Sequence, residues 1–207
     1  MSAVYVKTIF QDSQDFIWIG TQDGLNRYDG YHIKTFKTNQ NSKTAVSSND
    51  INCMFEDKLG KIYIGTNDGG MSVFNKYTET FTNYKSGLGS KKISSNSVRH
   101  IEELNDNELL IATEDGLNLF NKSTNQFNHI KCNNISATDL KFIFKNSKNR
   151  IFIASFGNGL FEYKADSKTL VNYDIPDVIS GSLSSGNSNE RFNLRCITEA
   201  NGNIWWF

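Results

Sequence analysis

The sequence has a single proline, Pro176, and only three cysteines among its 207 residues. The cysteines, Cys53, Cys132 and Cys196, match no short metal-binding or redox spacing, so we expect free thiols with a structural role. No apolar run is long enough to span a membrane. No charged segment followed by an apolar one precedes the first strand-like stretch, so we expect no signal peptide in this chain.

An excess of charge of one sign is also missing. The 22 basic and 22 acidic side chains give a formal net charge of zero. Nucleic acids and anionic membranes are bound by clustered lysine and arginine, so we expect no nucleic-acid partner and no direct membrane contact. Hydrophobic residues make up 38% and aromatic residues 13% of the chain, which is too much for a disordered protein and predicts a soluble globular one.

Motifs that carry catalysis are absent as well. There is no Gly-x-Ser-x-Gly elbow, no phosphate-binding loop and no Cys-x-x-Cys pair. The three histidines, His32, His100 and His129, have no paired spacing, and His100 falls in a column of packed inner-strand residues. The aspartates of the Asp-Gly turns, Asp23, Asp68 and Asp115, fit there for backbone reasons. We therefore expect no catalytic residue, no metal site and no cofactor.

An internal repeat is the main feature that is present. The run IWIGTQDGLNRYD from Ile17 returns as IYIGTNDGGMSVFN from Ile62, LLIATEDGLNLFN from Leu109 and IFIASFGNGLFEYK from Ile151. The anchor residues Thr21, Thr66, Thr113 and Ser155 lie 45, 47 and 42 residues apart, within the range of propeller blades. A fifth copy, ITEANGNIWWF, runs from Ile197 to Phe207.

Each repeat divides into four short strand-like pieces bounded by glycine, asparagine and aspartate turns, the signal of β-hairpins. Four antiparallel strands in about 45 residues form a β-propeller blade. We predict an all-β chain of about four and a half blades, with repeats at about 4–47, 48–94, 95–135 and 136–189 and an incomplete fifth at 190–207.

Two columns of the aligned repeats bear on how the blades pack. The position before each anchor is small in four repeats, at Gly20, Gly65, Ala112 and Ala154, and predicts that neighbouring blades approach closely there. A second column on the outer strands reads Phe36, Phe81, Phe127 and Leu170.

The repeated pattern Ile-Gly-Thr-x-Asp-Gly-Leu-x-x-Tyr/Phe-Asp/Asn, as in Ile19 to Asp29, resembles the two-component regulator propeller repeat. The resemblance extends from Val4 to Phe207. It implies part of a seven-bladed propeller in the periplasmic sensor of a hybrid two-component protein of the Bacteroidetes type, an inner-membrane protein with a histidine kinase in domains not present here. It also implies an oligosaccharide ligand and control of polysaccharide-utilisation genes.

The missing blades and the downstream sensor domains of the parent chain are then the expected partners. The two ends of the chain do not complement each other as the ends of a closed ring would, so the flanks of the end blades are left open. Exposed apolar flanks favour association, and we expect the isolated chain to self-associate.

Loops on a rigid scaffold are the usual place for a ligand site. The connections from outer to inner strands, at about 38–48, 85–96, 131–137 and 174–190, differ in length and share one face. Arginine and asparagine side chains at a channel mouth are suited to hydrogen bonds with sugar hydroxyls or carboxylates. The candidate ligand-binding residues that enter the inner strands from this face are Asn49, Asp50, Asn96, Arg99, Asp139, Lys141, Arg191, Asn193 and Arg195.

Two other functions stay open at this point. A propeller that only offers a rigid surface for protein interaction would need no ligand site. A propeller lyase or lactonase would need a cluster of inward histidine and carboxylate ligands, which the sequence does not provide.

Overall fold

The computed structural model describes residues 5–130, 138–173, 197–200 and 203–206, and every regular element in these ranges is a β-strand. The strands form four four-stranded antiparallel sheets and one hairpin. The first sheet contains β1 (Val6–Gln11), β2 (Ile17–Thr21), β3 (Gly24–Tyr28) and β4 (Ile33–Phe36), and the second contains β5 (Ile51–Glu56), β6 (Ile62–Thr66), β7 (Met71–Asn75) and β8 (Thr80–Tyr84). The third contains β9 (Val98–Asn105), β10 (Glu108–Thr113), β11 (Gly116–Asn121) and β12 (Gln126–Ile130), the fourth contains β13 (Leu140–Lys145), β14 (Ile151–Ser155), β15 (Leu160–Lys164) and β16 (Thr169–Asn172), and the hairpin contains β17 (Ile197–Ala200) and β18 (Asn203–Trp206).

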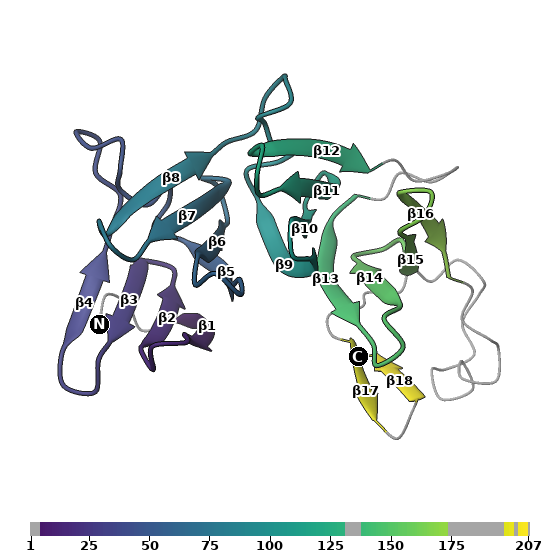
Figure 1. The fold of residues 1–207 in the computed structure, drawn as a ribbon, viewed down its shortest axis with the longest axis horizontal. Coiled ribbons are helices and arrows are strands. Elements are labelled where there is room, and N and C mark those ends of the chain that lie inside the picture. Colours follow the sequence, from purple (N-terminus) through teal and green to yellow (C-terminus); the bar gives the residue numbers. More distant parts are fainter. Residues whose placement is uncertain (1–4, 131–137, 174–196, 201–202, 207) are drawn as a thin grey trace.

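Each sheet is a simple meander, because every strand pairs with its neighbour in the sequence. The first strands of the sheets, β1, β5, β9 and β13, contact one another in chain order. The sheets therefore stand side by side as blades of an open arc, with the N-terminal sheet and the β17–β18 hairpin toward its two ends (Figure 1). The predicted all-β propeller architecture is confirmed. The exact limits of the repeats stay a prediction.

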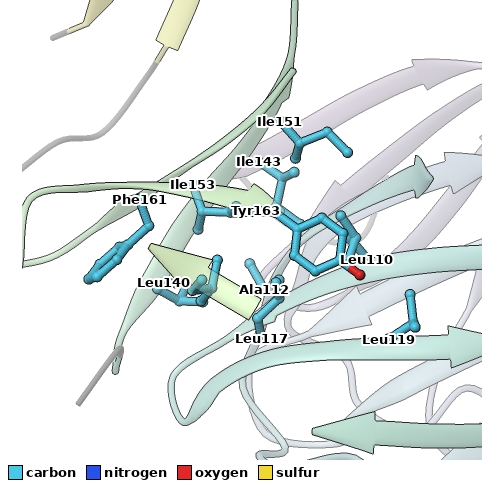
Figure 2. Close-up of a cluster of buried hydrophobic side chains, with 11 residues drawn as sticks. Leu110, Ala112, Leu117, Leu119, Leu140, Ile143, Ile151, Ile153, Phe161 and Tyr163 are labelled. Atoms are coloured by element: carbon cyan, nitrogen blue, oxygen red, sulfur yellow. The ribbon is translucent and has the colours of Figure 1, made fainter. Parts of the chain in front are cut away.

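A buried apolar layer separates each pair of neighbouring blades. Between the first two blades, Trp18 packs edge-on against Phe74, with ring centres 5.1 Å apart. Between the second and third, Tyr63 takes the place of Trp18 and Phe120 that of Phe74. Between the third and fourth the layer is mostly aliphatic, with Leu110 and Leu119 facing side chains of β13–β15 (Figure 2). The core is thus a series of layers, one for each blade junction, as packing of stacked repeats requires.

The column of small residues lies where the blades come closest. A Cβ atom added to Gly20 would come within 2.7 Å of Ile51 Cγ2, and one added to Gly65 within 2.4 Å of Cys53 Sγ and 2.6 Å of Val98 Cγ1. Ile51 and Val98 begin the inner strands of the following blades. The predicted close approach of neighbouring blades is confirmed at both positions.

The anchor hydroxyls close the turn between the second and third strands of each blade. Thr21 Oγ1 donates to the carbonyl of Gly24 and accepts from Asp23 N–H, and Thr66 and Thr113 make the corresponding bonds. The hydroxyl of Ser155 donates to the carbonyl of Gly159, so the fourth blade keeps the turn although its sequence departs from the pattern. The anchor hydroxyls thus have a structural role here.

The predicted column of outer-strand aromatics is wrong at one position. Ile33, not Phe36, pairs with the third-strand aromatic Tyr28, whereas Phe81 pairs with Phe74. The partners are five residues apart in the first blade and seven in the second, because the β3–β4 connection is shorter. Phe36 therefore packs toward the second blade, with its ring centre 5.4 Å from that of Phe74.

Candidate ligand-binding site

The candidate site lies at the end of the inner strands that the long outer-to-inner connections enter. Six of the nine predicted residues fall within the described ranges, and Arg191, Asn193 and Arg195 lie outside them. Asn49 and Asp50 precede β5 and Asn96 precedes β9, whereas Asp139 directly precedes β13. Arg99 and Lys141 are second residues of their strands, β9 and β13.

Three of the predicted residues meet across the junction of the third and fourth blades. Lys141 Nζ donates to Asp139 Oδ1 over 2.7 Å, and Arg99 Nε lies 4.0 Å from the same oxygen. Arg99 Nη1 also donates to Asn67 Oδ1, in the β6–β7 turn of the second blade, over 3.2 Å. The guanidinium of Arg99, in the third blade, therefore contacts residues of the second and fourth blades.

This cluster is half-buried and retains unused hydrogen-bonding capacity. The side chains of Arg99 and Lys141 are each 26% exposed, and that of Asp139 is 29% exposed. Arg99 Nε is buried and has no hydrogen-bond partner among the described residues. Lys141 Nζ also lies 5.2 Å from the centre of the Phe156 ring, which is 47% exposed. Cationic donors beside an exposed ring can bind an oxygen-rich ligand.

The two predicted asparagines within the described ranges, Asn49 and Asn96, form hydrogen bonds that hold the loops. Asn49 Oδ1 accepts from Thr38 N–H over 2.8 Å, and Asn96 Oδ1 accepts from Ser86 N–H over the same distance. Their main-chain carbonyls accept from Gly24 N–H and Gly70 N–H of the blade before. These two residues fasten the long loops to the blades, so we assign them a supporting position rather than a ligand contact.

Two residues of the same row were missed from the sequence. Lys7 in β1 and Asn52 in β5 occupy the register position of Arg99 and Lys141. Lys7 Nζ lies 2.5 Å from Asp50 Oδ1 and donates to Asn52 Oδ1 over 3.0 Å. The alignment of the four inner strands contained this signal, because one polar residue recurs at the same place in each. The inner face thus carries a row of three cations and one asparagine, with the carboxylates of Asp50 and Asp139 beside them.

Two other reactive side chains on the inner strands, the half-buried His100 and the buried Cys53, are unsuited to chemistry. His100 packs against Phe142 with ring centres 4.2 Å apart, and burial lowers its pKa to about 4. Burial raises the pKa of the free thiol of Cys53 to about 12. Within the described ranges, no group of three or more histidine, cysteine, aspartate or glutamate side chains is placed to hold a metal ion. The same part of the chain contains no helix of the length and apolarity needed to cross a membrane.

Comparison with known proteins gives matches at the level of both the repeat and the fold. The family model for the two-component regulator propeller matches residues 1–23 and 45–68. The extracellular domain of a putative hybrid two-component system from B. thetaiotaomicron is 25% identical and superimposes with a TM-score of 0.80, covering 100% of this chain and 28% of that one. A second such domain from the same organism, at 17% identity and a TM-score of 0.76 over 98% of this chain and 28% of its own, shares the fold.

A curated relative matches a shorter stretch. Histidine kinase P4 of Formosa agariphila is 38% identical over 47 residues, which are 23% of this chain and 3% of that protein. The chain thus spans less than a third of the solved domains and a small fraction of the kinase.

Proposed function

Since the chain is built from two-component regulator propeller repeats, we propose that it is part of the extracytoplasmic sensor of a hybrid two-component system. The observation that carries the proposal is the full-length superposition on the extracellular domain of such a system at 25% identity. A propeller fold alone would not suffice, because one fold supports many activities. The recurrence of the repeat sequence and the fold together support a sensor rather than an enzyme.

The proposed ligand is an oligosaccharide, and the proposed site is the row of polar side chains on the inner strands. Arg99, Lys141 and Asp139 offer cationic donors and a carboxylate acceptor within one half-buried cluster. Such groups can bind sugar hydroxyls through several hydrogen bonds at once. Because Arg99 of the third blade contacts residues of the second and fourth blades, a ligand bound there would favour one relative placement of these three blades. Binding energy shifts a conformational equilibrium in this way.

In the parent protein, that shift would be passed across the membrane to a histidine kinase and would control genes for polysaccharide use. The sequence of the gene beyond the codon for Phe207 tests this part directly. A membrane-spanning segment followed by a kinase domain is expected. A gene with neither would favour a propeller that serves as a protein-interaction surface.

Ligand binding is tested by calorimetric titration of the chain with a panel of plant and algal oligosaccharides. Arg99→Gln and Lys141→Gln are expected to weaken binding of the active oligosaccharide at least 10-fold, since each loses a charged hydrogen bond. Lys148→Gln, at an exposed position in the β13–β14 turn at the opposite end of the strands, is the matched control and should bind as the parent chain does. Equal affinity of all three variants would show that the ligand does not bind at the inner strands.

A further inference from the structure

A groove of about 700 Å³ lies between the second and third blades. It is lined by residues of the β5–β6, β7–β8 and β11–β12 turns and by the strands they join, and at one side by Ser13 and Gln14 of the β1–β2 turn. In an antiparallel meander these turns lie at the opposite end of the strands from the connections that carry the candidate site. The groove is therefore separate from the row of polar residues on the inner strands.

The neighbouring junction shows how this space is filled one blade earlier. Between the first and second blades, the guanidinium carbon of Arg27 lies 4.6 Å from the centre of the Phe16 ring and 5.7 Å from that of Trp18. Arg27 Nη2 donates to Glu79 Oε1 over 2.9 Å. A planar side chain thus occupies the gap between the two blades and is held by a carboxylate from the second.

The junction of the second and third blades lacks this arginine–glutamate pair. Arg27 pairs in register with Trp18, and Val73 pairs in the same way with Tyr63, so Val73 stands where the arginine would be. Asn125 stands at the position of Glu79, since each precedes the fourth strand of its blade with a positive φ, 55° and 51°. Two shorter side chains replace a long ion pair and leave the groove open.

Aromatic rings form the walls of the groove. Tyr63 and Phe120 lie in the buried layer beneath it, and the Tyr84 ring packs edge-on against Phe120 with centres 5.3 Å apart. The Tyr84 hydroxyl donates to Asn125 Oδ1 over 2.8 Å at the rim. Tyr77, which is 99% exposed, also lines the groove. Apolar ring faces with a few polar groups at the edge are the usual composition of a small-molecule site.

The charged side chains that line the groove are all cationic. Four lysines, Lys58, Lys61, Lys76 and Lys122, line it, and no aspartate or glutamate does so among the described residues. Lys76 and Lys122 are held by carboxylates behind the groove, and Lys58 pairs with Asp106 on the surface. Lys61 is exposed and has no ion-pair partner in the described part of the chain. The groove therefore attracts an anion and has one cation free to pair with it.

We propose that this groove is a second binding site, which takes an acidic saccharide. A sugar ring carrying a carboxylate or a sulfate would pack against the tyrosine rings with its anionic group toward Lys61. This inference rests on the proposed function in one respect, that the ligand is a saccharide. It adds a second location and requires a negative charge on the ligand.

Calorimetric titration of the 207-residue chain with three trisaccharides tests the proposal. The probes are a galacturonate, a sulfated galactoside and the neutral galactoside, and the two acidic probes distinguish a carboxylate from a sulfate ligand. At least one acidic probe should bind 10-fold or more tightly than the neutral one. Its affinity should fall as sodium chloride is raised from 50 to 500 mM, because salt screens an exposed ion pair.

Two variants locate the site. Val73→Arg combined with Asn125→Glu restores the ion pair of the first junction without changing the net charge of the groove, and should weaken acidic binding at least 10-fold. Lys61→Gln changes only an exposed residue, so it tests the site without altering the core, and should weaken binding several-fold. Lys148→Gln removes a comparable exposed lysine away from the groove and should have no effect. Circular dichroism spectra matching that of the parent chain verify that the variants fold.

Each of the other possible outcomes refutes a defined part of the proposal. Equal affinity for the neutral probe would refute the need for a charge. Unchanged acidic binding in both the Val73→Arg, Asn125→Glu double variant and Lys61→Gln would refute the groove as the binding site. Loss of binding in Arg99→Gln alone would place the ligand at the inner strands and leave the proposed function standing. Failure of the chain to bind any saccharide of either panel would overturn the saccharide ligand at both sites.

Discussion

Lys122 Nζ lies 3.5 Å from Asp57 Oδ2 across the junction of the third and second blades, and Lys76 lies 3.4 Å from Asp12 one junction earlier. Both carboxylates are only 1% exposed. Burial raises the pKa of Asp12, but hydrogen bonds from the Trp18 indole and from main-chain N–H groups, together with the charge of Lys76, outweigh this and lower the pKa overall. A buried ion pair thus links the second blade to the first and the third blade to the second.

Lys122→Met is expected to lower the free energy of unfolding by about 3 kcal/mol, because it leaves the buried charge of Asp57 without its cation. Asp57→Asn combined with Lys122→Met should regain part of this loss, since asparagine can still accept the N–H groups of Leu59 and Lys61. Urea denaturation followed by circular dichroism measures both. A double variant no more stable than Lys122→Met would show that the lost charge partner is not the cause.

Stability should fall as the pH decreases from about 6.5 to about 4, because of His100. The unfolded chain takes up a proton on this histidine near pH 6.5, whereas burial lowers its folded pKa to about 4. The contribution is fully present above pH 6.5, and about 2–3 kcal/mol of it is lost by pH 4. In His100→Phe, which copies the aromatic residue of the fourth blade, urea midpoints at pH 7.5 and 4.5 should differ less than in the parent chain. An unchanged difference would rule out His100 as the source.

Gly65→Val should destabilise the chain by about 1–3 kcal/mol, because the added atoms overlap Cys53 and Val98 of the neighbouring strands. Gly65→Ala should cost less, and Cys53→Ala should offset part of that cost by removing the sulfur that the new Cβ would meet. Thermal unfolding of the two single variants and their combination measures the coupling. Strictly additive losses would argue against direct contact.

Self-association is expected from the outer face of the first blade. In the second blade the equivalent residues are Met54, which is half-buried, and Phe81, which is buried, and both pack in the layer against the first blade. In the first blade, by contrast, Ile9 is 67% exposed and Ile33 is 44% exposed. Apolar surface of this kind favours association. Sedimentation velocity at micromolar concentration should show species larger than a monomer, and Ile9→Lys with Ile33→Lys should reduce them. A clean monomer of the parent chain would contradict the expectation.

The sequence was sufficient to predict the blades because their signals are local. Alternating apolar residues, Asp-Gly turns and the Thr21-type anchor recur every 45 residues or so, and each acts within one hairpin. The row of inner-strand residues was only partly predicted. Arg99 and Lys141 were identified as neighbours of a variable loop, but Lys7 and Asn52 were missed, because their importance depends on partners in the next blade.

The groove and the position of Phe36 could not be predicted from the sequence, because both depend on contacts between residues that are not adjacent in the chain. The groove exists because Val73 replaces an arginine whose role is visible only in the first junction. Phe36 was misplaced because a shorter turn changes which strand residue it pairs with, and pairing depends on backbone hydrogen bonds rather than on residue type.

The ion pair between blades has a consequence for the order of the repeats. At the next junction, the register positions of Asp57 and Lys122 hold Leu104 and Ala165, and Leu104 packs against the apolar layer there. The blades are therefore not interchangeable modules. Deleting the second and third blades would place Asp12 against Ala165 and bury a charge with no cation beside it. A chain shortened in this way would fold poorly and would be selected against.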